Sequence, residues 1–293
     1  MTVRLTGVGK RYGRGGPWVL REVELSLEPG EIVRIEGANG SGKSTLLKLL
    51  GGLERPSAGT LTAPARRAYV PERFPPALPF DARAYLRRHG RLRGLSAAEA
   101  LRRADHWLER FGITSYADTP VGRLSKGTCQ KVAVAQALLA EAELLLLDEA
   151  WTGLDRPART ELDLAVAERA AAGGLVVHVD HDPTRLAGLL TAVRTVEDGT
   201  LHTAHLPTPD QDGPRTTLVV SAPTLPPWLP PHTLHPDGTA ELDVPATHSD
   251  TVLRRLLAAT PPVHIHAVRS RVVPSGPAGS EAPGARGTAE PSG

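Results

Sequence analysis

Residues 37–45 read GANGSGKST, and this short segment constrains the fold more than any other part of the sequence. It follows the apolar run 31–35 and precedes a leucine-rich stretch that predicts a short helix ending at two glycines. A glycine-rich loop between a strand and a helix N-terminus lets backbone N–H groups close around phosphate oxygens. The segment therefore predicts an α/β fold with a phosphate-binding loop.

The residue types in this loop fit the pattern G-x-x-x-x-G-K-[ST]. Gly37 and Gly42 allow the tight backbone, and Lys43 reaches the terminal phosphates as a point charge. The hydroxyl of Ser44 suits a Mg²⁺ position. The residues expected to contact the nucleotide are Gly37, Asn39, Gly40, Ser41, Gly42, Lys43, Ser44 and Thr45.

An acidic pair, Asp148 and Glu149, ends the run of four leucines at 144–147. A carboxylate at the end of a buried strand can hold Mg²⁺, generally through water, which is the role expected for Asp148. Glu149 can orient or polarise an attacking water. Such a pair alone is more often a simple strand end, but beside a phosphate-binding loop it predicts nucleotide hydrolysis.

Bulk composition limits the classes of protein to consider. A chain of 293 residues predicts one large domain or two modest ones, and we expect two unequal pieces. The formal charge of +2 gives no basic field, so no nucleic-acid partner is expected. A single cysteine excludes an internal disulfide and fits a reducing cytoplasm. No signal peptide is recognisable, and no apolar run reaches the ~18 residues of a spanning helix.

The N-terminal part reads as one α/β unit. Strand-like runs at 3–5, 19–27 and 31–35 alternate with glycine-rich turns and predict a small antiparallel sheet that leads into the loop. The apolar run 175–179 is typical of a central strand covered on both faces. We expect this main domain to span residues 1–201.

A helical piece is expected within this domain at about 81–139. Ser96 and Glu99 have the spacing of a capping box, so a helix should begin after Ser96. The residues predicted to share its buried face are Leu101, Ala104, Leu108 and Phe111.

The C-terminal third has a different composition. Proline and histidine accumulate from residue 202 onward, and residues 202–216 are expected to be a linker. Residues 217–272 predict a small α+β domain, with a helix from about Asp250. Residues 273–293 are expected to be disordered by composition. The predicted strands of the small domain are 217–221, 239–244 and 263–268.

Taken in order, the motifs resemble the ATP-binding subunit of the ABC transporter superfamily over about residues 2–201. LSKGTCQ at 124–130 is similar to the family signature LSGGQxQ and keeps Ser125 and Gly127. These residues open a helix, so a hydroxyl and N–H groups are aimed at an anion. In the family that anion is the γ-phosphate held by another subunit. The resemblance therefore implies a head-to-tail ATP sandwich with a second copy or a paralogue.

The resemblance implies roles for four further residues. Tyr12 in KRYG occupies the place of the aromatic ring that stacks on adenine, and Asp155 ends the D-loop GLD. Glu72 in YVPERF takes the glutamine-loop position near Mg²⁺ and the transmembrane partner, and His181 in HVDHDP matches the histidine that contacts the γ-phosphate. The implied catalytic residues are Glu149, His181 and Lys43, and the implied Mg²⁺ ligands are Ser44, Glu72 and Asp148.

The implied function is ATP hydrolysis that powers export through a separate multi-spanning permease, with ATP and Mg²⁺ as cofactors. The subunit would be cytoplasmic and bound at the inner face of the membrane through that permease. Lys126 in the signature, and Glu72, resemble the ABC-2 type exporter branch. Two alternatives stay open: a soluble ABC ATPase acting on nucleic acid or the ribosome, and a catalytically degenerate regulatory subunit. Ala150-Trp151-Thr152 departs from the usual Pro-Thr-Ser of the family.

Overall fold

The fold is described from a computed structural model. Part of the predicted linker, residues 205 and 207–214, lies outside the described residues, and so does the whole predicted tail. In the described part no helix combines the length and apolar content needed to cross a membrane. The described residues are 2–13, 15–73, 79–204, 206, 215–226, 229, 232–257, 259 and 261–271.

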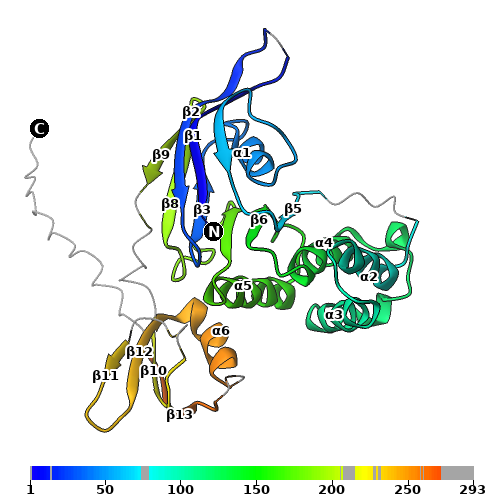
Figure 1. The fold of residues 1–293 in the computed structure, drawn as a ribbon. Helices are drawn as coiled ribbons and strands as arrows, with labels where there is room; N and C mark the ends of the chain where they lie inside the picture. Colours follow the sequence, from blue (N-terminus) through cyan, green and yellow to red (C-terminus); the bar gives the residue numbers. More distant parts are fainter. Residues whose placement is uncertain are drawn as a thin grey trace, which may run out of the picture.

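A six-stranded sheet in the order β5-β6-β7-β3-β8-β9 forms the centre of the protein (Figure 1). All neighbouring pairs are parallel except β8 and β9. The leucines of β6 alternate between two separate cores, which explains why this strand is apolar at successive positions. Its strands are β3 (Ile32–Glu36), β5 (Arg67–Val70), β6 (Leu144–Asp148), β7 (Leu175–Val179), β8 (Ala192–Glu197) and β9 (Thr200–Ala204).

Helices cover both faces of this sheet. The helix α1 (Lys43–Leu50) packs with the second sheet on one face, where Leu46 and Leu47 are fully buried. The helices α4 (Lys126–Leu139) and α5 (Arg156–Ala171) contribute to the core on the other face. The α/β fold class is therefore confirmed, and the predicted helix after the loop ends at Leu50, just before the two glycines.

The second sheet is antiparallel and three-stranded, in the order β2-β1-β4. The strand β1 is longer than predicted, since it continues well past residue 5, whereas β2 agrees with its predicted range to within one residue. The sheet ends beside the loop, which places Tyr12 directly after β1. Its strands are β1 (Val3–Arg11), β2 (Trp18–Leu27) and β4 (Ala58–Thr62).

The helical piece contains α2 (Ala82–Leu92) and α3 (Ala97–Arg110), followed by the short 3-10 turns η1 (Thr114–Tyr116) and η2 (Val121–Arg123). The predicted start of α3 is confirmed, since the Ser96 hydroxyl accepts a hydrogen bond from the Glu99 N–H at 3.2 Å. The prediction for Leu101 is wrong, because 37 % of this residue is exposed. The buried face follows Ala100 at four-residue steps, and Leu101 is rotated out of it.

The C-terminal unit is a four-stranded antiparallel sheet in the order β11-β12-β10-β13, covered by one helix (Figure 1). Leu218, Leu242 and Leu256 form its small core. The helix begins earlier than predicted. The elements are β10 (Arg215–Ser221), β11 (His232–Leu234), β12 (Ala240–Pro245), α6 (Ala246–Leu257) and β13 (His264–Arg271).

Candidate functional site

Strand order gathers the predicted site at one edge of the central sheet. The loop at 37–45 follows β3, which lies between β7 and β8, and β6 is the next strand beyond β7. Because these strands are parallel, their carboxyl ends meet at the same edge. Asp148 ends β6 and His181 follows β7, so both lie at the edge that carries the loop.

The loop backbone requires glycine. Gly37 has φ of 138° and Gly42 has φ of 111°, values that L side chains rarely adopt. A Cβ on Gly37 would lie 2.4 Å from the Val196 carbonyl oxygen, so the loop passes against β8 with no room for a side chain. Gly42 is also the N-cap of α1 and offers no side-chain acceptor, which leaves the first N–H groups of the helix free for an anion.

Two side chains in the loop fit a bound phosphate. The hydroxyl of Ser41 is buried and has no hydrogen-bond partner among the described residues. Lys43 is only 8 % exposed, and its Nζ donates to the Gly37 oxygen at 2.7 Å and to the Ala38 oxygen at 2.9 Å. A phosphate would give Ser41 the missing partner and would give the ammonium group a charged acceptor. The residues present therefore fit ATP in this loop.

Oxygen ligands suited to Mg²⁺ lie beside the loop. The Ser44 hydroxyl is 3.2 Å from Asp148 Oδ1, and Asp148 is 3 % exposed. The hydroxyl of Tyr69 donates to Asp148 Oδ2 at 2.9 Å. Burial, together with the Asp148 charge, raises the pKa of Tyr69, so the phenol stays protonated as a donor. A hydroxyl and a carboxylate facing each other fit a hard cation.

Sequence reasoning missed Tyr69. It lies on β5, which pairs with β6, and Tyr69 stands opposite Leu146 in the register. The only local signal was the short apolar alternation that ends at Val70. That signal can predict a strand but cannot say which strand lies beside it.

The two residues predicted to act at the γ-phosphate contact each other. The Nε2 of His181 is 2.8 Å from Oε1 of Glu149. Glu149 has φ of 52°, and its N–H donates to the Val179 oxygen at 3.0 Å, which fixes the turn after β6 to the end of β7. The His181 side chain is 62 % exposed, so it faces solvent rather than the core.

Tyr12 is held against the first turn of α1. Its hydroxyl donates to the Glu54 carboxylate at 2.9 Å and lies 3.5 Å from the Thr45 hydroxyl. The Nζ of Lys10 lies 5.0 Å from the ring centroid and 3.0 Å from the Glu54 carboxylate. One side of the residue remains open, because 52 % of it is exposed. The ring therefore lies close to the nucleotide loop, and its stacking on adenine stays a prediction.

Glu72 is less closely tied to the site. Its side chain is 52 % exposed and forms an ion pair with Arg73 at 3.6 Å. Within the described ranges no hydrogen bond or ion pair joins Glu72 to the other two predicted Mg²⁺ ligands. The role of Glu72 at the metal stays a prediction.

The signature residues lie at the start of α4. The Ser125 hydroxyl caps this helix by accepting the Thr128 N–H at 3.1 Å. A Cβ on Gly127 would lie 2.8 Å from the Gly153 oxygen, so the signature passes directly against the D-loop. Among the described residues no hydrogen bond or ion pair joins Ser125 or Gly127 to residues 37–45. Within one chain, the described residues of the signature and of the loop are therefore not joined by such a contact.

Asp155 joins the D-loop to the signature helix. Its carboxylate caps α5 by accepting the Ala158 N–H at 3.0 Å, and it accepts a second bond from Lys131 on α4 at 2.7 Å. The hydrogen bond from Lys131 holds the pKa of Asp155 below its usual value. Asp155 therefore remains a carboxylate and fixes the start of α5 to α4.

His178 lies in the interior behind this edge. It is fully buried, and neither ring nitrogen has a hydrogen-bond partner among the described residues. Burial, with the charges of Arg34 and Arg185, lowers the pKa of His178 to about 3. On acidification, His178 is therefore protonated at a higher pH in the unfolded chain than in the folded one. The free energy of unfolding consequently falls as pH drops from 6.5 toward 3.

Between pH 6.5 and 5 the wild type is expected to lose about 2 kcal/mol of unfolding free energy through His178, at about 1.4 kcal/mol per pH unit. The variant His178→Leu is expected not to show this loss. Asp163, whose pKa is raised to about 6 by burial, takes up its proton in the folded state and shifts stability the opposite way. It is present in both proteins and cancels in the comparison. Urea unfolding at the two pH values measures the difference. The exposed His202 provides the control variant His202→Leu, and equal slopes for both variants would contradict the assignment.

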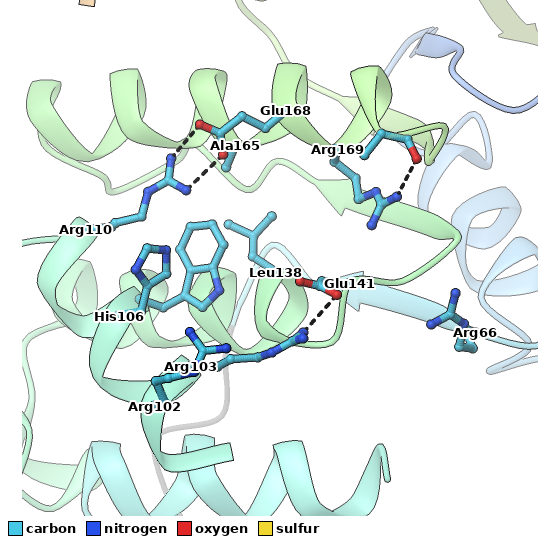
Figure 2. Close-up of a pocket in the computed structure, with 12 residues that line it drawn as sticks. Arg66, Arg102, Arg103, His106, Arg110, Leu138, Glu141, Ala165, Glu168 and Arg169 are labelled. Carbon is cyan, nitrogen blue, oxygen red and sulfur yellow. Dashed lines mark hydrogen bonds and ion pairs between the residues drawn. The ribbon is translucent and has the colours of Figure 1, made fainter. Parts of the chain in front are cut away.

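A cavity of about 580 Å³ lies between α3, α4 and α5 (Figure 2). Five arginines line this cavity. Two of them, Arg103 and Arg110, are already paired with glutamates. Arg110 binds Glu168 at 2.9 Å and also Glu161, while its guanidinium lies 4.6 Å from the Trp107 ring centroid. Arg103 binds Glu141 at 3.0 Å. The Arg110 contacts fasten the helical piece to α5.

The fold and the edge site together define a P-loop nucleotide-binding protein of the α/β class. The sequence profile described as ABC transporter matches residues 20–152. The zinc import ATP-binding protein ZnuC of Cereibacter sphaeroides is 40 % identical over 58 % of this chain and 69 % of its own length. The chain therefore belongs to the ABC transporter family, as an ATP-binding domain with ATPase activity.

Further relatives agree on the family and differ in the direction of transport that their names give. The cytochrome c biogenesis ATP-binding export protein CcmA of Hyphomonas neptunium is 34 % identical over 61 % of this chain and 90 % of its own length. A solved ATP-binding subunit of an ABC transporter superimposes with a TM-score of 0.63 at 26 % identity, over 69 % of this chain and 90 % of that one. These relatives include an importer and an exporter by name, so the comparison assigns no direction.

Proposed function

We propose that this chain is the ATP-hydrolysing subunit of a membrane exporter and that it closes head to tail with a second copy or a paralogue over two ATP molecules. The observation that carries the proposal is that the predicted phosphate-binding residues and the predicted signature residues lie on different elements. The loop, Asp148 and His181 share one sheet edge, whereas Ser125 and Gly127 open a different helix. A helix start capped by a hydroxyl suits an anion that another subunit presents.

In this proposal each residue at the sheet edge has a distinct task. Lys43 and the loop N–H groups bind the phosphates, and Ser44 and Asp148 hold Mg²⁺. When bound, Mg²⁺ neutralises charge that develops on the phosphate oxygens. Glu149 orients the attacking water, and His181, whose Nε2 lies against Glu149, contacts the γ-phosphate.

Two features favour the ABC-2 type exporter branch. Lys126 is exposed at the start of α4 and replaces the second glycine of the common signature. The C-terminal unit from β10 to β13 also resembles the small domain carried by many ATPases of that branch. The permease would hold the subunit at the inner face of the membrane, and Glu72 would lie near that contact.

Tagged purification from gently solubilised membranes tests this function. A polytopic protein with ABC-2 topology is expected to co-elute, and the complex is expected to hydrolyse ATP. Co-elution of a permease with importer topology would overturn the direction while leaving the ATPase role intact. An ATPase rate that rises with DNA, RNA or ribosomes, in protein that never fractionates with membranes, would favour the soluble alternative. ATP binding without hydrolysis in the complex would favour the regulatory one.

A further inference from the structure

Behind the Glu149 and His181 contact lies a buried polar bridge between the turn after β6 and the segment after β7. Trp151 follows Glu149 by two residues and is 2 % exposed. Its indole Nε1 donates to Oδ1 of Asp163 on α5 at 2.8 Å. A buried indole N–H requires an acceptor, and Asp163 supplies it. The bridge thus begins on the turn that carries Glu149.

Arg185 continues the bridge to both neighbours of His181. Its Nη1 lies 3.2 Å from Oδ2 of Asp163, and its Nη2 lies 3.3 Å from Oδ2 of Asp182. Its Nε is 3.9 Å from a carboxylate oxygen of Asp180. The Arg185 side chain is only 14 % exposed, so three carboxylates fix a guanidinium that cannot move freely into solvent.

These polar contacts hold the segment that carries His181, together with a bond from Arg34 Nη1 to the Pro183 oxygen at 2.6 Å. The Asp180 carboxylate accepts the Asp182 N–H at 2.7 Å, which tightens the turn around His181. His181 itself receives little packing, since 62 % of its side chain is exposed. Its position against Glu149 therefore depends on where the turn is held, and Arg185 holds the residues on both sides of it.

We propose that Asp163 and Arg185 are positioning residues that hold the turn around His181 so that its imidazole stays against Glu149. Trp151 anchors the same pair to the turn that carries Glu149. The bridge connects the turn that carries Glu149 to the turn that carries His181, and the contact between these two side chains connects the turns a second time. A shift of either turn therefore moves Glu149 and His181 apart. A misplacement of ~1 Å in such a pair can lower a rate by as much as 10²-fold. The inference rests on the proposed hydrolytic role of Glu149 and His181.

The bridge is costly to maintain, which argues that it has a use beyond packing. Asp163 is buried, and burial raises its pKa to about 6 in spite of the nearby Arg185 charge. A buried ion pair can be replaced by apolar residues at little cost, whereas removal of one partner leaves an uncompensated charge. The variant that tests the bridge should therefore keep the shape and the acceptor for Trp151. Asp163→Asn does both and removes only the charge that faces Arg185.

A double-mutant cycle on the full-length chain, in complex with its co-purified partner, tests the proposal. Asp163→Asn is expected to lower kcat about tenfold, with the KM for ATP unchanged within about twofold and the melting temperature within about 4 °C. In a His181→Ala background the same change is expected to have no further effect, because the positioned group is gone. Glu168→Gln, on the same helix and remote from this bridge, is the matched control and should leave kcat unchanged.

Other outcomes overturn the proposal. An Asp163→Asn effect of equal size with and without His181, or no effect on kcat, shows that the bridge does not act through the histidine. If Asp163→Asn does not fold, Trp151→Phe, which keeps an aromatic ring but removes the N–H donor together with part of the indole volume, is taken through the same cycle. Glu149→Gln runs in parallel: an inactive wild type, or full activity in Glu149→Gln, rejects the proposed function itself. Loss of activity in Glu149→Gln with full activity in Asp163→Asn rejects only the positioning role.

Discussion

Glu149→Gln is expected to slow ATP turnover about 10²- to 10³-fold while ATP binding stays intact, because general-base assistance contributes on this scale. The glutamine keeps the size of the side chain and can still meet His181, whose Nε2 lies 2.8 Å from the carboxylate. It cannot accept a proton from water. The backbone of residue 149 is fixed by the Val179 oxygen at 3.0 Å, so the turn itself should not change.

Turnover is measured as phosphate release under saturating ATP, and the dimer by size exclusion with ATP present. The variant is expected to accumulate as an ATP-bound dimer. Glu143→Gln is the matched control, because Glu143 precedes the same strand at its opposite end and pairs there with Arg66. Turnover at the wild-type rate in Glu149→Gln would remove Glu149 from its proposed role.

The second large effect is expected from Lys43→Met, which should lower ATP affinity at least about 100-fold. Lys43 Nζ now donates to two loop carbonyls at 2.7 and 2.9 Å and lies within reach of a phosphate in the same loop. Two charge-assisted bonds to phosphate contribute about 1.5–3 kcal/mol each, and about 1.4 kcal/mol corresponds to a tenfold change in affinity. Methionine keeps an unbranched side chain that is one heavy atom shorter, and it removes the charge.

Calorimetric titration with ATP measures this loss directly. Lys48→Met serves as the control, since Lys48 lies on the last turn of α1 at the end away from the loop. The melting temperature without nucleotide shows whether the loop variant is folded. ATP binding at wild-type affinity in folded Lys43→Met protein would show that the nucleotide does not occupy the loop as proposed.

The antiparallel sheet and the C-terminal unit show what the pattern of a single sequence can and cannot supply. Runs such as 19–27 carry strong alternation, so β2 is predicted almost to its ends. The short β4 (Ala58–Thr62) is mostly exposed, carries no apolar alternation and was not predicted. It forms because β1 offers it a free edge, which is a pairing between residues far apart in the chain. The same reason explains why β9 and β11 were missed.

The sequence by itself determined the position of each motif whose structure depends only on neighbouring residues. The loop at 37–45, the acidic pair after β6 and the Ser125 cap of α4 are each written in one contiguous stretch, because each is a strand end or a helix start with local hydrogen bonds. Only the tertiary structure decided which of these groups meet. Parallel strand order brought His181 to Glu149, placed Tyr69 on Asp148, and left the signature apart from the loop. Such pairings join residues that are distant in the chain, and their energies depend on burial and register, which no local pattern encodes.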